Sequence, residues 1–123
     1  MKRTTEDYLK YILILGRKKG MARAVDLAET MNVSKPTVSV TLKNLASEGY
    51  IRVGDGHELL LTDKGRKIAE AIVDRHKIFF DILVSLGIDE ITAEDDACHM
   101  EHAISPKSFE ALKGYFIKAG NKE

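Results

Sequence analysis

Residues 24–48 read AVDLAETMNVSKPTVSVTLKNLASE, and they carry the clearest indication of how the chain folds. Apolar residues at helical spacing predict a short helix over residues 24–31. Ser34 is then a typical N-cap for a second helix, and Pro36 fits the first turn of that helix, where its missing N–H is not needed. Two short helices joined by a turn of three or four residues predict a helix-turn-helix.

The second of these helices, expected to last to about residue 48, has an unusual outer face. Its apolar stripe is Val38, Leu42 and Leu45, which leaves a face of hydroxyls, an amide, one lysine and one valine. Such groups suit base edges and thymine methyls, whereas a solvent-exposed structural helix more often carries Glu/Lys pairs. We therefore predict DNA recognition by the following residues: Ser34, Lys35, Pro36, Thr37, Ser39, Val40, Lys43 and Asn44.

A β-hairpin is expected directly after the recognition helix. Residues 50–53 and 57–61 flank Gly54-Asp55-Gly56, which predicts two strands and a tight turn. The hairpin makes the fold a winged helix. Arg52 or His57 would reach a phosphate or the minor groove from this hairpin, although either is equally compatible with a solvent-exposed loop residue.

The rest of the chain is predicted to be helical, which makes the fold mainly α. A first helix over residues 4–18 takes Thr4 or Thr5 as its N-cap, and Thr62 caps a long helix from Asp63 to about Leu86. A further helix opens at residues 92–95, and Pro106 begins a last one. The stripe of aromatic and apolar residues on that last helix indicates either a core or a dimer interface.

The charge is balanced overall but divided along the chain. The 123 residues have a formal net charge of zero, yet residues 1–75 hold 14 Lys and Arg against 10 Asp and Glu, while residues 76–123 hold 5 against 9. A basic front half and an acidic rear half fit a DNA-binding part joined to a cation-binding part. No apolar run reaches the length of a membrane span, and the start lacks a signal peptide, so we expect a cytoplasmic protein.

Residues 96–105, DACHMEHAIS, place a thiol, a carboxylate and an imidazole within five positions. If this stretch is helical, Cys98, Glu101 and His102 share one face and are able to bind one ion. The alternative is a buried cysteine, a surface glutamate and a structural histidine. His76, midway along the long helix, is a further candidate ligand, although a lone histidine in a helix is usually structural.

The whole chain resembles the short branch of the metal-dependent diphtheria-toxin-repressor and manganese-transport-regulator family. The matching motifs extend over nearly the full length, and their order makes the joint match specific. They are Thr4-Thr5-Glu6-Asp7-Tyr8-Leu9, Ser34-Lys35-Pro36-Thr37-Val38-Ser39, Leu61-Thr62-Asp63-Lys64-Gly65, Arg75-His76, Asp96-Ala97-Cys98 and Glu101-His102.

The resemblance implies a homodimeric repressor that binds a palindromic operator when divalent iron or manganese is present. Residues 1–65 would form the winged helix-turn-helix domain, and residues 66–123 a helical metal-binding and dimerisation domain. The resemblance also implies an activating metal site at Asp7, Cys98, Glu101 and His102, with His76 serving a neighbouring one. Zinc or cobalt would be accepted in vitro. The SH3-like domain of the long branch is not expected in a chain of this length.

Two departures from the family pattern bear on the number of metals. Cys98 resembles the cysteine that iron-responsive members carry at this position, whereas Lys10 stands where manganese-type members carry a carboxylate ligand. We predict one metal per chain, with the charge of Lys10 replacing part of a second. The alternative is that Lys10 extends into solvent and that a second ion binds through His76 and Glu94.

Other functional classes are less well supported. A zinc hydrolase would need a different spacing than His99-Met100-Glu101-His102 provides, so we predict that the protein is not an enzyme. A winged-helix redox sensor working through Cys98 is the main alternative, because one cationic neighbour suffices to activate a thiol. A protein-interaction module without a DNA role explains neither the charge division nor an exposed Val40.

Overall fold

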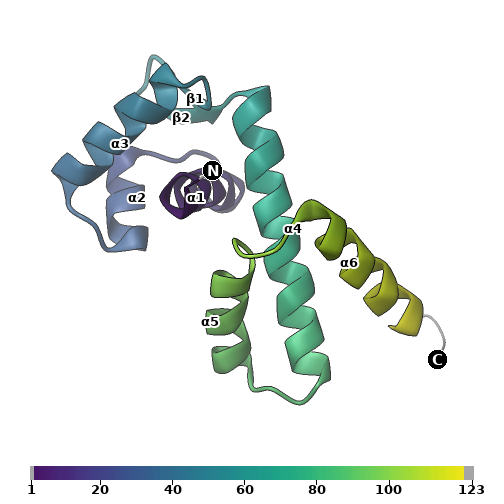
Figure 1. Ribbon diagram of the computed structural model, residues 1–123. Coiled ribbons are helices and arrows are strands. Elements are labelled where there is room, and N and C mark those ends of the chain that lie inside the picture. Colours follow the sequence, from purple (N-terminus) through teal and green to yellow (C-terminus); the bar gives the residue numbers. More distant parts are fainter. Residues whose placement is uncertain (1, 121–123) are drawn as a thin grey trace. The chain divides into compact units, whose positions relative to one another are not determined.

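The computed structural model describes residues 2–120 and confirms a mainly helical fold (Figure 1). These residues form two compact units, divided between Ala71 and Ile72. The elements, in order, are α1 Arg3–Lys19, α2 Ala24–Met31, α3 Lys35–Ser47, β1 Ile51–Val53, β2 Leu59–Leu61, α4 Asp63–Ser85, α5 Glu90–Met100 and α6 Pro106–Gly120.

The helix-turn-helix is formed by α2 and α3, as predicted. The hydroxyl of Ser34 accepts a hydrogen bond from the Thr37 amide at 3.3 Å, so Ser34 is the N-cap of α3, and Pro36 lies in the first turn. Asn32 ends α2 in the left-handed conformation that helix termini favour. The stripe of Val38, Leu42 and Leu45 is buried, so the predicted inner face of α3 is confirmed.

The wing is an antiparallel hairpin with Ile51 opposite Leu61 and Val53 opposite Leu59. Leu59 also forms a bridge to Ala22, which lies between α1 and α2. Because this bridge ties the hairpin to the chain before the helix-turn-helix, β2, α2 and α3 belong to one packed unit.

The beginning of α4 is fastened to the end of the recognition helix. The Thr62 hydroxyl donates to the Gly49 carbonyl at 2.7 Å and accepts from the Gly65 amide at 3.2 Å, which confirms Thr62 as a helix cap. The ammonium of Lys64 donates to the carbonyl of Glu48, the C-cap of α3, at 3.0 Å and lies over the Tyr50 ring at 4.4 Å. Thr62 and Lys64, two polar residues of the segment 61–65, therefore fix the junction between α3 and α4.

The second unit contains most of α4 with α5 and α6. Its core is Ile78 and Phe79 from α4, Ala97 from α5 and Phe109 from α6. The two phenylalanine rings meet edge to face with centroids 5.8 Å apart, a favourable aromatic geometry. This core holds α4 against α5, and the candidate metal ligands of this unit lie on these two helices or directly after α5.

Two predicted helix boundaries are wrong. The first helix begins at Arg3 after Lys2, so neither Thr4 nor Thr5 is its N-cap. The helix expected from residue 92 begins two residues earlier, at Glu90, because the Asp89 carboxylate accepts from the Thr92 amide at 2.9 Å and caps the helix there. This hydrogen bond also holds the pKa of Asp89 below its usual value.

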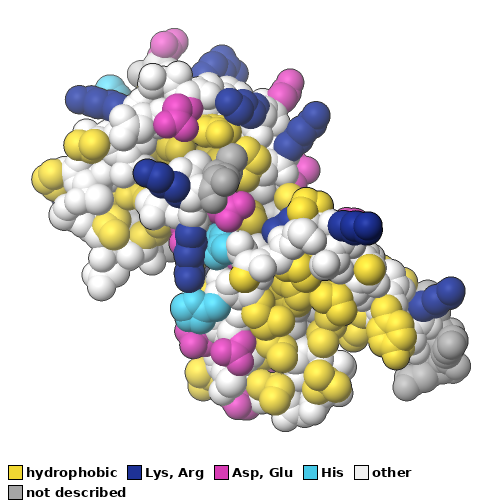
Figure 2. Space-filling view, in the orientation of Figure 1, with side chains coloured by type: hydrophobic (Ala, Val, Ile, Leu, Met, Phe, Trp, Pro, Cys, Tyr) yellow, Lys and Arg dark blue, Asp and Glu magenta, His cyan; other side chains and the backbone are white. Residues whose placement is uncertain are grey.

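No helix in residues 2–120 is long and apolar enough to cross a membrane. Only part of the stripe on α6 lies in the core. Phe109 is buried in the core, whereas Tyr115 is 75% exposed. Figure 2 shows hydrophobic surface, in yellow, on the second unit. Its further exposed apolar residues are Val84, Leu86, Ile88, Ile91, Met100, Leu112 and Ile117.

Candidate metal centre and DNA-binding surface

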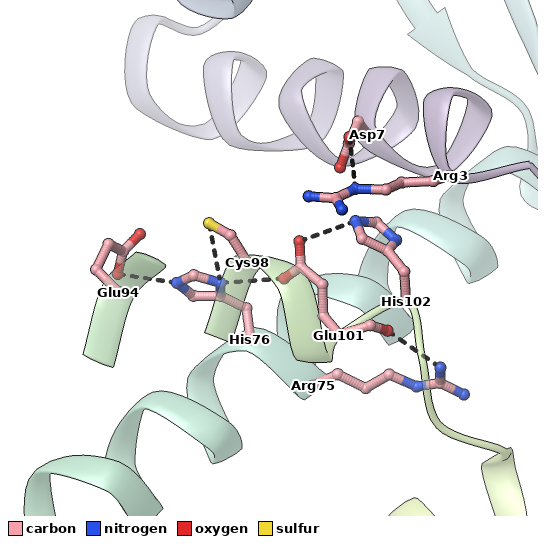
Figure 3. A network of polar contacts seen from close by, with 8 residues as sticks. All are labelled: Arg3, Asp7, Arg75, His76, Glu94, Cys98, Glu101 and His102. Atoms are coloured by element: carbon pink, nitrogen blue, oxygen red, sulfur yellow. Dashed lines mark hydrogen bonds and ion pairs between the residues drawn. The ribbon is translucent and has the colours of Figure 1, made fainter. Parts of the chain in front are cut away.

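Glu101 is a fully buried carboxylate at the end of α5. Its oxygen Oε2 lies 3.0 Å from Nδ1 of His76, and Oε1 lies 3.4 Å from Nε2 of His102 (Figure 3). Burying a carboxylate is costly unless charges or hydrogen bonds compensate it. Two imidazoles meet that need here, and the same three groups are nitrogen and oxygen donors for a cation.

His76 is held by carboxylates on both sides of its ring. Nδ1 faces Glu101, and Nε2 lies 2.9 Å from the Glu94 carboxylate. The thiol of Cys98 lies 3.9 Å from the same Nδ1. One nitrogen of His76 therefore faces a thiol and a buried carboxylate, while the other is engaged by a carboxylate that is 60% exposed.

His76, Cys98 and Glu101 each offer a ligand atom, and these atoms lie within 4.8 Å of one another. The donor set is one imidazole nitrogen, one sulfur and one carboxylate oxygen. Imidazole and carboxylate ligands suit Mn, Fe and Zn, and thiolate favours softer ions than calcium or magnesium. The residues present therefore fit a divalent transition metal.

The local structure explains how these side chains come together. Cys98 is in the last turn of α5, and Glu101 follows as its C-cap with nearly helical backbone angles, while His102 is in the turn beyond. The prediction of one continuous helical face is therefore right for Cys98 and Glu101 and wrong for His102. His76 is on α4, 22 residues before Cys98, and the packing of α4 on α5 in the core brings it to them.

In the first unit, Asp7 and Lys10 both stand on α1. Asp7 forms an ion pair with Arg3 at 3.7 Å. Lys10 is only 4% exposed, and its ammonium lies 5.2 Å from the centre of the Tyr11 ring. Lys10 therefore does not extend into solvent, which was one part of the two-ion alternative.

The predicted DNA-facing residues lie on the surface of the first unit. All eight candidates from Ser34 to Asn44 are exposed, and Val40 reaches 61% exposure although it is apolar. Arg52 is also exposed, on β1 of the wing, and His57 adopts a positive φ of 64° in the hairpin turn. Two of the hydroxyl groups on this surface bond to each other, since Ser34 donates to the Thr37 hydroxyl at 2.8 Å.

Arg75 also contacts this site, although no sequence pattern assigned it a role. Its guanidinium donates to the Glu101 carbonyl at 3.2 Å and to the Ile104 carbonyl at 3.0 Å. The position of Arg75 beside His76 was a weak signal, because an arginine next to a candidate ligand is common on helix surfaces. Only the position of the turn after α5, 26 residues later in the chain, reveals what Arg75 contacts.

Comparisons with known proteins identify the family of the chain. Residues 1–56 match the N-terminal DNA-binding domain of the iron-dependent repressors, and residues 62–117 match their metal-binding and dimerisation domain. The Escherichia coli O6:H1 transcriptional regulator MntR is 38% identical over 117 residues, which are 95% of this chain and 76% of MntR. An uncharacterised helix-turn-helix transcriptional regulator of Methanocaldococcus jannaschii is 35% identical and matches over 99% of both chains.

A solved manganese-dependent transcriptional repressor in complex with manganese superposes with a TM-score of 0.75 at 31% identity. The match covers 90% of this chain and 51% of that one, so the chain spans about half the length of the solved repressor. A winged helix followed by a cluster of candidate metal ligands is the arrangement expected of a metal-responsive transcriptional regulator. The chain belongs to the iron-dependent repressor family.

Proposed function

We propose that the protein is a transcriptional repressor of metal-homeostasis genes that binds its operator only when a divalent metal, Mn²⁺ or Fe²⁺, is present. The observation that carries this proposal is the buried carboxylate of Glu101, placed among the donor atoms of His76 and Cys98. The same chain carries a winged helix whose recognition helix exposes an apolar and hydroxyl-rich face. The proposal assigns no enzymatic reaction and a cytoplasmic location.

Each ligand of the second unit has a separate role in this proposal. Cys98 contributes its sulfur, Glu101 its carboxylate, and His76 its Nδ1. Glu94 accepts a hydrogen bond from Nε2–H of His76, which fixes the tautomer and the orientation of the ring. Glu94 is thus an outer partner of His76 rather than a ligand of a second ion.

We assign Asp7 and His102 to the same ion because of the family resemblance at these two positions. Asp7 would offer a carboxylate from the domain of residues 1–65, and His102 an imidazole from the domain of residues 66–123. When bound, the dication would supply positive charge that compensates its anionic ligands. Asp7→Asn tests the assignment, and unchanged metal affinity and operator binding would remove Asp7 from the ligand set.

The DNA partner proposed is a palindromic duplex bound by a homodimer, with half-sites about one helical turn, or about 34 Å, apart. Lys35, Lys43 and Arg52 serve phosphates, while Val40 contacts a thymine methyl. The exposed apolar residues of the second unit are the proposed contacts between subunits, consistent with the dimerisation domain that this part of the chain matches. Binding should weaken steeply as salt rises, because phosphate contacts release counterions.

Metal activates the repressor only if the DNA-competent state binds the ion more tightly than the inactive state does. By linkage, operator DNA must tighten metal binding by the same factor. The test measures operator affinity with Mn²⁺, Fe²⁺, Co²⁺ or Zn²⁺ and with a chelator, always under strong reductant. Equal affinity with and without the chelator, at unchanged fold, would refute the proposal.

Cys98→Asp separates this function from thiol-based redox sensing. The substitution keeps an anionic ligand but removes the oxidisable sulfur. As a ligand variant it should remain metal-activated and shift its preference towards Mn²⁺, since carboxylate suits manganese. Cys98→Ala is the matched control, and it should lose activation by every metal. A Cys98→Asp protein that no metal activates would instead favour the redox alternative.

A further inference from the structure

Arg75 lies next to His76 on α4, and its guanidinium contacts the chain immediately after α5 (Figure 3). One nitrogen, Nη1, donates to the Glu101 carbonyl at 3.2 Å and to the Ile104 carbonyl at 3.0 Å. The last carbonyls of a helix have no partner within the helix. Arg75 therefore acts as a side-chain cap for the C-terminus of α5, where a cation is also favoured by the helix dipole.

The guanidinium is itself held in place by α6. Its central carbon lies 5.6 Å from the centre of the Phe109 ring, and Phe109 is a buried core residue. The amide of Phe109 donates to the Ser105 carbonyl at 2.9 Å, which joins the same turn to the start of α6. A planar guanidinium that rests on an aromatic ring and donates to fixed carbonyls has little freedom to rotate.

We propose that Arg75 is a positioning residue for the metal centre. Two consecutive residues of α4 hold Glu101, since Arg75 holds its main chain and His76 holds its carboxylate. With both ends fixed, the Glu101 carboxylate points towards Cys98 and His76 before any ion arrives. His102 follows Glu101 directly, so the same contact limits where its imidazole lies. This inference rests on the proposed metal-binding function.

Loss of such an outer partner typically lowers metal affinity by about 10- to 100-fold. Arg75→Met removes the donor and the charge but keeps a long apolar stem, and we expect a loss in that range for Mn²⁺ and Co²⁺. Arg75→Lys keeps a cation and a donor and should recover most of the affinity.

Lys113→Met is the matched control. The Lys113 ammonium also lies over the Phe109 ring, at 6.0 Å, and it pairs with Asp74 at 2.8 Å, but neither interaction involves the turn after α5. If Arg75 acts only by placing a cation on Phe109, the two methionine variants should lose affinity equally. If Arg75 acts through the carbonyls, Lys113→Met should bind both metals as the unmodified protein does.

Hydrogen exchange on the metal-free proteins gives a readout that does not depend on metal. The Ala103 amide donates to the Met100 carbonyl at 3.0 Å and reports on the turn. It should exchange faster in Arg75→Met and at the normal rate in Lys113→Met. Should Arg75→Met not fold, Arg75→Lys replaces it, with a smaller affinity loss that must accompany faster Ala103 exchange.

Two results would overturn the proposal: normal metal affinity in a folded Arg75 variant whose Ala103 amide exchanges faster, or equal losses in Arg75→Met and Lys113→Met. Failure of the proposed function looks different. In that case the unmodified protein itself binds neither Mn²⁺ nor Co²⁺ at operator-binding concentrations, and the variants cannot differ from it.

Discussion

Gly65→Ala should destabilise the first unit, although alanine is the better helix former. Gly65 lies in the first turn of α4 and is buried, and a Cβ at this position would collide with the Tyr50 carbonyl oxygen. Hydrogen bonds hold that oxygen in place. It accepts hydrogen bonds from the amide and from the hydroxyl of Thr62, each at 3.1 Å.

The size of the effect follows from two opposing terms. Inserting a carbon into a tightly packed contact costs about 1–3 kcal/mol. Replacing a helical glycine by alanine stabilises the helix by up to about 1 kcal/mol. The clash is with backbone rather than with a flexible side chain, so the upper part of the range applies and the net loss is about 2 kcal/mol. For a unit of this size, a loss of that order lowers the melting temperature by roughly 8–16 °C.

Gly16→Ala is the control, and it should change stability in the opposite direction. Gly16 is inside α1, and a Cβ there would meet nothing within 4 Å. It should gain about 0.5–1 kcal/mol from helix propensity alone. Urea unfolding monitored by circular dichroism measures both variants. A Gly65→Ala protein as stable as Gly16→Ala would refute the close approach of α4 to Tyr50.

Three further predictions concern other parts of the chain. Val40→Ala should relax the preference at one thymine by a fraction of the roughly 1–3 kcal/mol of a good base contact, while Lys43→Ala should weaken all sequences alike, as binding-site selection will show. Asp26 accepts hydrogen bonds from Lys19 and the Arg23 amide, which depress its pKa. The ionised Asp26 therefore adds up to about 1 kcal/mol to the free energy of unfolding above about pH 4, and this stabilisation is lost as pH falls through the depressed pKa. The stabilities of Asp26→Asn and of the unmodified protein should therefore converge in acid unfolding. Lys10→Glu should raise the calorimetric stoichiometry from one to two metals per chain, and two sites of comparable affinity in the unmodified protein would refute the single-metal hypothesis.

The fold was predictable from sequence because its decisive signals are local. Ser34 before Pro36 marks the start of α3, and Gly20 ends α1 in the left-handed conformation that glycine adopts readily. The wing follows from a glycine-rich turn between apolar strands. Each of these signals is read within about ten residues, so tertiary packing has little opportunity to override it.

The boundaries that were wrong lie where several residues compete for one role. Asp89 and Thr92 are both good N-caps, three residues apart, and Asp89 prevails because its carboxylate accepts from the Thr92 amide. At the other end, α5 stops at Met100 without a glycine. The carbonyls of the turn are satisfied by Arg75 from α4, and no local pattern in residues 96–105 carries that information.

The geometry around His76 also favours a single ion over two. The imidazole has one nitrogen facing Cys98 and Glu101, and its other nitrogen is already held by Glu94 at 2.9 Å. A second ion that binds through Nε2 would have to displace the contact between His76 and Glu94, whose side chain is 60% exposed. The contact with Glu94 therefore disfavours a second ion at His76.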